Sequence, residues 1–455
     1  MLDFGWRRGP RSLPEQWSTR CPKRTSAVTP AAKWRCTDQW SAIITSGAWL
    51  KVVAPLRERD FRLLWSGNLV SLLGDGIFTV ALALEALRVD HQPTGLAYVL
   101  ACRAVPAVAL AIVGGVVVDR IPRRTAMLVA DLVRGAAVGL IAILVVEHAI
   151  GLWELAVMAV AFGTADAFAG PAFLAVIPEL LPAELITQAN ALNSTSAELA
   201  VNLIGPAVGG LAVAAIGTAA AFGFDAATFA VSAGCLAGLR WRYRPGPSGK
   251  SLLAEAAERI HYIVSRRWLF LLLMGAAVAN LVGMGPYVVL LPVLVRHVLH
   301  ASPVVLGLVY ASAGAAGVAA SLVVARLGSP RHLLETMWSA YSVAGILLAA
   351  ICFAPNAWVT ALLSAGSAGL IVYGDVLYFT RLQTSVPKHL MGRVSSVSYV
   401  MVSTLTPVGM ILGGVVAAAL GARTAFLLSG LLAAACGLVL LVPGARSLDA
   451  EPAAT

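Results

Sequence analysis

Twelve apolar segments, each about as long as a helix needs to cross a bilayer, fill the sequence between residues 63 and 443. They cover 63–86, 95–118, 125–146, 153–177, 187–215, 219–239, 268–295, 303–325, 333–354, 357–380, 394–419 and 422–443. Only 12% of the residues are charged, about half the usual share in a soluble domain. This pattern excludes a soluble enzyme, a nucleic-acid-binding domain and a disordered protein. It predicts an all-α polytopic membrane protein with twelve transmembrane helices.

The two halves of the apolar region repeat each other. Gly209-Gly210, Gly217 and Phe222 recur 204 residues later as Gly413-Gly414, Gly421 and Phe426. We therefore expect two pseudo-symmetric six-helix bundles, over residues 55–239 and 267–443. Parallel repeats of this kind are typical of transporters, which bind their substrate near the membrane midplane between the two halves and rock one half against the other.

Three polar segments flank or join the bundles. Residues 1–54 form a basic extension, either disordered or upstream of a later start near Val52 or Val53. Residues 240–266 are predicted as a cytoplasmic linker with an amphipathic surface helix, and residues 444–455 as a cytoplasmic tail. Nineteen Lys and Arg residues fall in the loops on one side, against Arg88, Arg296 and Arg423 on the other. Because cationic loops stay inside, we expect both termini in the cytoplasm and the protein in the plasma (inner) membrane.

The loop after the second apolar segment carries a basic motif. It contains Gly115, Asp119, Arg120, Arg123 and Arg124, and it resembles the G-x-x-x-D-R-x-x-R-R signature of the major facilitator superfamily. The resemblance implies a latch that closes the cytoplasmic side. In it the carboxylate faces a helix N-terminus, while the arginines hold the carboxylate and contact lipid phosphates. An ordinary basic turn is the alternative interpretation.

The fifth segment contains Gly205, Pro206, Gly209 and Gly210. This run resembles the end of the antiporter motif of the same superfamily, although Val201 stands where a glycine is usual. The resemblance implies export by exchange. Proline bends a helix and glycines allow close helix packing, so a packing kink explains the same residues.

Shorter motifs point to one branch of the superfamily. Phe61-Arg62 before the first helix, Arg103 to Pro106 in the second, Asp131 to Arg134 in the third and Gly170-Pro171 in the fourth resemble the enterobactin-exporter-like and macrolide-efflux-like transporters. The branch implies the fold of the superfamily with two six-helix bundles, and it names no substrate.

Ionisable residues inside apolar segments are costly and mark candidate functional sites. Asp75 lies near the midplane of the first helix, and a carboxylate in an apolar cavity can take up and release a proton. We expect Asp75 to couple transport to protons and to pair with Arg103. The alternative for Asp75 is an ordinary helix–helix hydrogen bond. Asp166 is a further candidate at the same site.

Two other sets of ionisable residues are candidates for separate roles. Asp131 and Arg134, three residues apart on one helix face, are predicted as a latch-linked pair rather than a substrate site. Asp375, beside Tyr373 and Tyr378, could bind a cationic substrate or a second proton. Glu198 and Asp225 are weaker candidates, and Glu198 could pair with the latch arginines.

Together these features predict proton-coupled efflux of a hydrophobic or amphiphilic small molecule (drug, macrolide or siderophore class) by alternating access. An importer or facilitator of a small metabolite is the alternative. A remote one is an intramembrane aspartyl protease, because Gly74-Asp75 and Gly374-Asp375 are paired, although the glycine such proteases need two residues earlier is missing.

No nucleotide-binding or metal-binding motif is present, so we expect a non-enzyme with no cofactor, no metal and no ATP. The expected partners are a small-molecule substrate, protons and the lipid bilayer, with no nucleic acid. The chain is expected to work as a monomer.

Overall fold

The computed structural model describes residues 53–111, 114, 121–240, 265–327, 330, 332–385, 398 and 400–439. The chain divides into two units, Met1–Lys51 and Val52–Thr455, and every described residue belongs to the second. The N-terminal extension, most of the predicted linker and the C-terminal tail lie outside the described residues. So do Gly115, Asp119 and Arg120 of the predicted latch.

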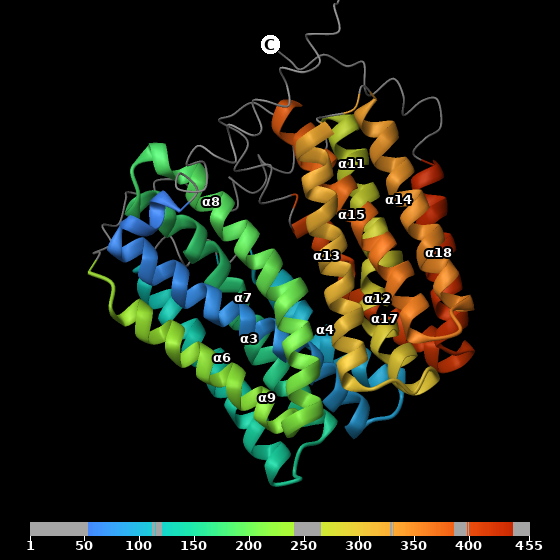
Figure 1. The fold of residues 1–455 in the computed structure, drawn as a ribbon, viewed down its shortest axis with the longest axis horizontal. Helices are drawn as coiled ribbons and strands as arrows, with labels where there is room; N and C mark the ends of the chain where they lie inside the picture. Colours follow the sequence, from blue (N-terminus) through green and yellow to red (C-terminus); the bar gives the residue numbers. More distant parts are fainter. Residues whose placement is uncertain are drawn as a thin grey trace, which may run out of the picture. The chain divides into compact units, whose positions relative to one another are not determined.

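Every regular element of the first half is helical in the described residues (Figure 1). The elements are η1 (Ala54–Arg57), α3 (Arg59–Val89), α4 (Pro93–Ala109), α6 (Arg123–Val146), α7 (Leu152–Leu180), α8 (Ala183–Ala197), η2 (Glu198–Ile204) and α9 (Gly205–Ala237). α9 holds parts of two predicted segments, which meet at Gly217, where the backbone leaves the helical region. The apolar, Ala-rich and Leu-rich segments thus form helices.

The second half is built in the same way. Its elements are α11 (Arg267–Ala279), η3 (Asn280–Met284), α12 (Gly285–Val293), η4 (Leu294–Val298), α13 (Pro303–Leu327), α14 (Leu333–Ala350), η5 (Ile351–Phe353), α15 (Ala357–Ser385), α17 (Thr406–Leu420) and α18 (Ala422–Val439). Within the described ranges, nine helices are long and apolar enough to span a membrane, with shorter apolar helices at Pro93–Ala109 and Ala422–Gly437. This set is consistent with the twelve predicted spans.

The internal repeat is visible in the backbone. Gly217 and Gly421, 204 residues apart, both adopt φ +84°, a region that favours glycine because it has no Cβ atom. The close helix crossings repeat as well. A Cβ atom on Gly76 of α3 would lie 2.8 Å from the Cα of Gly205, and one on Gly285 of α12 would lie 2.8 Å from the Cα of Gly409. The same packing solution therefore serves both halves.

The two halves touch through helices that carry small residues. A Cβ atom on Gly210 of α9 would lie 3.1 Å from the Cα of Gly307 in α13, and one on Gly414 of α17 would lie 3.4 Å from the Cα of Thr94 in α4. Gly210 and Gly414 are repeat counterparts, so these contacts are related by the internal symmetry. Both involve the first turns of α4 and α13.

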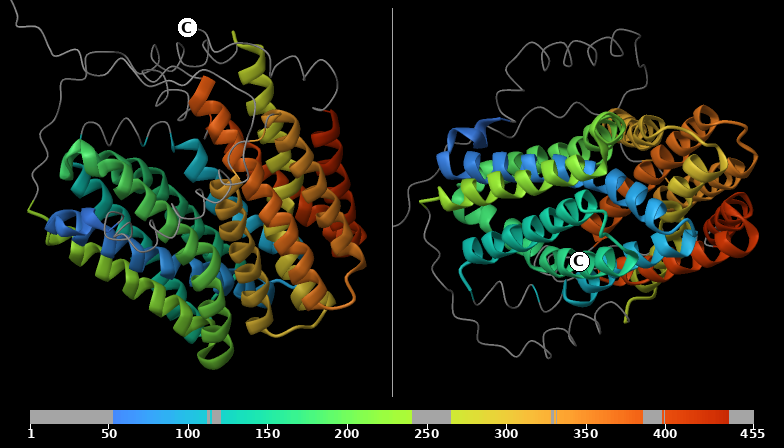
Figure 2. Two further views of the ribbon diagram at one scale, coloured as in Figure 1. Left: turned by 45° about the horizontal axis from the view of Figure 1, so that its top comes forward. Right: turned by 90° about the horizontal axis from the view of Figure 1, so that it is seen from below.

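α3 lies at the centre of the first half. It packs along α9 (Figures 1 and 2), and from Ile77 to Leu87 its side chains are almost completely buried. Phe78, Phe162 and Phe222 belong to the core cluster that surrounds this part of α3. α4 packs on α7, and α6 packs on both α7 and α9. This arrangement brings the polar residues of five helices together.

Candidate functional site

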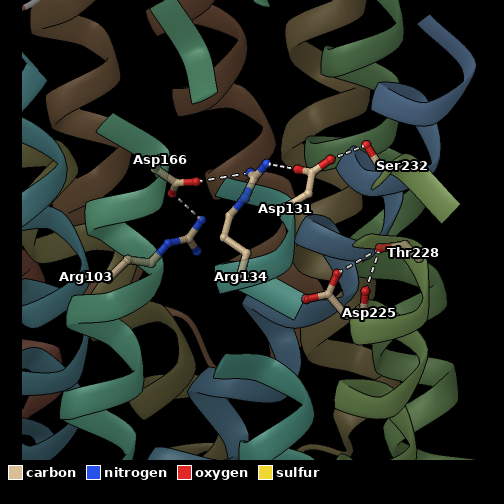
Figure 3. A network of polar contacts seen from close by, with 7 residues as sticks. All are labelled: Arg103, Asp131, Arg134, Asp166, Asp225, Thr228 and Ser232. Atoms are coloured by element: carbon tan, nitrogen blue, oxygen red, sulfur yellow. Dashed lines mark hydrogen bonds and ion pairs between the residues drawn. The ribbon is translucent and has the colours of Figure 1, made fainter. Parts of the chain in front are cut away.

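Four charged side chains from three helices form a continuous chain in the first half (Figure 3). Arg103 of α4 lies 3.5 Å from Asp166 of α7, and Arg134 of α6 lies 3.2 Å from the other oxygen of the same carboxylate. Arg134 also bonds Asp131 at 2.5 Å. Ser232 of α9 donates to the second Asp131 oxygen at 2.6 Å. The predicted site residues Arg103 and Asp166 therefore join the predicted latch-linked pair in one network.

Local sequence explains why these groups meet. Gly163, three residues before Asp166, lies so close to the backbone of Arg103 that a Cβ atom there would be 3.2 Å from the Arg103 Cα. The missing side chain lets α4 and α7 approach until the guanidinium reaches the carboxylate. Asp131 and Arg134 are three residues apart and share one helix face.

Aromatic rings support both guanidinium groups. The Arg103 guanidinium lies 4.4 Å from the ring centre of Phe162, and the Arg134 guanidinium lies 4.7 Å from that of Phe229. Phe162 is 1% exposed and stacks on Phe78 with ring centres 5.0 Å apart. A cation over a ring face is attracted by the ring quadrupole, so the rings stabilise arginines that the apolar core would otherwise disfavour.

Asp75 has no salt bridge to any of the described residues. Its Oδ1 atom is buried with no hydrogen-bond partner among the described residues, while the residue as a whole is only half-buried. The expected ion pair with Arg103 is wrong, because α4 packs mainly on α7 and brings Arg103 to Asp166 instead. Arg103 and Arg134 still act on Asp75 through longer-range Coulombic attraction.

The network is electrically balanced without Asp75. Arg103 and Arg134 supply two positive charges, and Asp131 and Asp166 supply two negative ones. An ionised Asp75 would add an unbalanced negative charge to a site of low dielectric constant, which favours the neutral form of such a group. Asp75 is therefore a carboxyl group able to exchange a proton without breaking an ion pair.

A pocket opens on the polar side of the Asp131–Arg134 pair. Its lining includes Asn68 and Ser71 of α3 and Phe173 of α7, together with Ser232. The pair that we predicted as latch-linked thus lines a polar pocket and joins the network of Asp166. Its link to the latch stays a prediction.

The second half places its acidic candidate elsewhere. Asp375 of α15 is accessible to solvent and accepts a hydrogen bond from the Tyr341 hydroxyl at 2.7 Å. The ring of Tyr341 packs against Gly374. The buried hydroxyl of Tyr378 has no hydrogen-bond partner among the described residues. Asp375 is thus an accessible acid beside aromatic rings, and no ion pair to it is found in the described part of the chain.

The described arginines of the predicted latch contact other helices of the first half. Arg123 forms an ion pair with Glu179 of α7, and it donates to the Ala175 carbonyl at 2.6 Å. Arg124 donates to the carbonyl of Ala237 at the end of α9 at 2.5 Å. Glu198 accepts instead from Asn202 at 3.0 Å. The expected pairing of Glu198 with Arg123 and Arg124 is therefore not found among these contacts.

The helix-five motif packs on both halves. Gly205 and Pro206 lie against Gly76 of α3, and Gly209 lies against Ile77. Gly210 faces the backbone of α13 across the boundary between the halves. The predicted close packing is confirmed, and the implied role in export stays a prediction.

Sequence reasoning named Asp225 as a weaker candidate and missed the other polar residues of α9 beside it. Asp225, Thr228 and Ser232 are spaced three and four residues apart, which places them on one helix face, and all three are buried. The missed aromatic residues are Phe162 and Phe229. Polar spacing along the sixth apolar segment is the signal that could have revealed this face. Among the described residues, no group of three or more His, Cys, Asp or Glu side chains is placed to hold a metal ion.

The family model described as a transmembrane secretion effector matches residues 50–455. The chain belongs to this family of the major facilitator superfamily. It is a multi-pass membrane protein of the cell membrane and a small-molecule transporter rather than an enzyme.

Two similar proteins illustrate the family. The multidrug efflux pump Tap of Mycobacterium tuberculosis is 28% identical over 406 residues, which cover 86% of this chain and 95% of Tap. The macrolide efflux protein A of Streptococcus pyogenes is 25% identical over 405 residues, covering 86% and 97% of the two chains.

Solved structures agree on the fold. A bacterial homologue of the lysosomal transporter Spinster superposes with a TM-score of 0.65 at 14% identity, covering 87% of this chain and 96% of that one. A bacterial homologue of the iron transporter ferroportin gives a TM-score of 0.65 at 16% identity, covering 86% and 98%. At these identities the likeness concerns the fold alone.

Proposed function

We propose that this protein exports hydrophobic or amphiphilic small molecules in exchange for protons. The observation that carries the proposal is the unpaired Asp75 carboxyl beside a network whose charges already balance. Such a group can gain or lose a proton while the surrounding ion pairs persist. The efflux activities in the names of Tap and macrolide efflux protein A support export rather than import.

The proposed transport cycle is alternating access between bundles 55–239 and 267–443. The symmetric contacts of Gly210 with α13 and of Gly414 with α4 lie next to the loops that contain few cations, which the loop charges assign to the outside. The cycle would break these contacts when the outer side opens. The latch of Arg123 and Arg124 would hold the inner side closed in that state. The protein would work as a monomer in the bilayer with both termini in the cytoplasm.

Asp375 is the proposed contact for a cationic substrate. Its carboxylate is accessible and lies beside Tyr341, and neighbouring aromatic faces can stack on a lipophilic cation. Asp375→Asn should raise the KM for the cationic dye ethidium several-fold and leave a neutral substrate unaffected.

Transport into inverted membrane vesicles tests the proposal. An imposed proton gradient, acidic inside, should drive ethidium or a macrolide into vesicles that contain the protein. Asp75→Asn should abolish this uptake, whereas Asp60→Asn, on the surface of the same helix, should preserve it. Uptake that ignores the gradient, or coupled uptake that persists in Asp75→Asn, would contradict proton exchange and favour a facilitator.

A further inference from the structure

A second buried carboxyl group lies against Gly74, the residue that precedes Asp75. Asp225 of α9 is 0% exposed, and its Oδ2 atom has no hydrogen-bond partner among the described residues. Its Oδ1 atom and the Thr228 hydroxyl both lie against Gly74, so closely that a Cβ atom on Gly74 would overlap them. The glycine immediately before Asp75 therefore makes room for this group.

The hydrogen-bond geometry around Asp225 fits a neutral carboxylic acid. The Thr228 oxygen lies 2.7 Å from the backbone carbonyl of Asp225 and 3.2 Å from its Oδ1 atom. A hydroxyl has one proton to donate, and the shorter contact takes it. The longer contact is then satisfied when the Asp225 carboxyl donates its own proton to the Thr228 oxygen. As an anion, Asp225 would leave two buried oxygens without a donor, at a large desolvation cost.

The charges around Asp225 lead to the same assignment. The groups that act on it from neighbouring helices are Asp75 of α3, Arg103 of α4 and Arg134 of α6. Both arginines are held in the ion pairs with Asp166 and Asp131. Two adjacent carboxyl groups that lack a cation of their own do not ionise together, because the second charge is opposed by the first.

We propose that Asp225 is a second proton-binding residue, which shares one exchangeable proton with Asp75 between α9 and α3. Asp75, which is only half-buried, exchanges with the solvent. When Asp75 loses its proton, the proton of the Asp225 carboxyl moves to the Asp75 carboxylate, and the Thr228 hydroxyl turns from the backbone carbonyl to the Asp225 carboxylate. The release of the first proton to the solvent lowers the charge of the pair by one, and the transfer of the remaining proton from Asp225 to Asp75 leaves that charge unchanged. This proposal extends the proposed function of Asp75.

Infrared spectroscopy of the purified full-length protein in lipid tests the assignment without any substrate. Neutral carboxylic acids absorb in a separate carbonyl-stretch region, where ionised carboxylates do not. At pH 7 the wild type should show bands of this kind. Asp225→Asn should remove one of them, and Thr228→Val should keep that band but shift it to higher frequency because its hydrogen bond is lost.

Two further variants sharpen the test. Asp75→Asn should shift the Asp225 band, because its neighbour in the pair changes. Asp60→Asn, which alters a surface carboxylate, should leave the region unchanged. If Asp225→Asn matches the wild type in this region, Asp225 is ionised and the proposal is overturned. If Asp75→Asn leaves the Asp225 band in place, the sharing of a proton is overturned.

A variant that folds poorly, or a protein that does not transport, can be told apart from a protein in which Asp225 is ionised. Thr228→Val keeps both carboxyl groups, so its band shift can be read even where Asp225→Asn folds poorly. A wild-type protein that shows the Asp225 band but no gradient-driven uptake of ethidium or a macrolide would overturn the proposed function and leave the buried neutral acid intact.

Discussion

The two halves of this transporter have similar backbone geometry but different ionisable residues inside their helices. Gly217 and Gly421 adopt the same φ, and eight residues after each glycine the first half has Asp225 where the second has Ser429. Ser429 donates to the carbonyl of Val282 in η3, just as Asp225 lies against Gly74 in α3. Gly285 takes the place of Gly76 in the repeated helix crossing, so Met284 occupies the position that corresponds to Asp75.

This difference separates the features that helix packing requires from the features that the chemistry of the site requires. The close helix crossings at glycine residues and the positive φ of Gly217 and Gly421 recur because both halves must bury the same helix surfaces. Among the described residues, the network of Arg103, Asp131, Arg134 and Asp166 has no counterpart in the second half, so packing alone does not demand it. A buried charge is expensive unless it is paired, and the first half therefore retains its network for a purpose other than folding. This contrast supports the proposal that the first half exchanges protons and that the second contacts the substrate through Asp375.

The largest effect should follow from removing the central cation. Arg134→Met leaves the buried Asp131 without its ion pair and the half-buried Asp166 with only Arg103, and breaking a buried pair costs ~3–5 kcal/mol of unfolding free energy. Denaturation in mixed micelles measures this cost. The matched control is Arg59→Met, which breaks the exposed pair with Asp60 and should cost ~0–1 kcal/mol. Equal losses of unfolding free energy in the two variants would show that the first-half network contributes no more to stability than an exposed ion pair.

A smaller effect is expected from closing the space beside Asp75. Gly74→Ala places a methyl group against Asp225 and Thr228, and overpacking of this kind costs ~1–3 kcal/mol. Gly223→Ala is the control, because no atom lies within 4 Å of the added methyl group there, and it should be neutral or stabilise the helix by up to ~1 kcal/mol. Denaturation of both variants measures their unfolding free energies. A Gly74→Ala protein as stable as the wild type would show that Asp225 can move away from the added methyl group.

The smallest effect concerns the aromatic support. Phe162→Leu removes the ring that faces both Arg103 and Arg134, whereas Phe222→Leu removes an equally buried ring that contacts Phe78 edge-to-face and has no cation–π contact among the described residues. Both variants leave a similar cavity. Phe162→Leu should therefore cost ~1 kcal/mol more than Phe222→Leu, the contribution of the cation–π contacts. Equal unfolding free energies for the two variants would show that Phe162 contributes only hydrophobic packing.

The sequence predicted the helices well because hydrophobic length and glycine repeats depend on local pattern. It also identified Asp75, Arg103, Asp131, Arg134 and Asp166 as ionisable residues that need a reason to be buried. It did not predict their pairing, because the partner of Arg103 depends on which helix α4 faces. That choice follows from the close approach at Gly163, a tertiary contact without a periodic signal. Thr228 and Ser232 were missed because single hydroxyl groups are common in apolar helices.

The most direct measurement of the central claim moves the carboxyl group from one half to the other. In proteoliposomes with an internal pH-sensitive dye, the wild type and Asp375→Asn should move protons while they transport a macrolide. The double variant Asp75→Asn/Met284→Asp, which places the acid at the corresponding position of the second half, should move none, because no balanced arginine network is found around Met284 in the described structure. Proton movement in the double variant equal to that of the wild type would contradict the account.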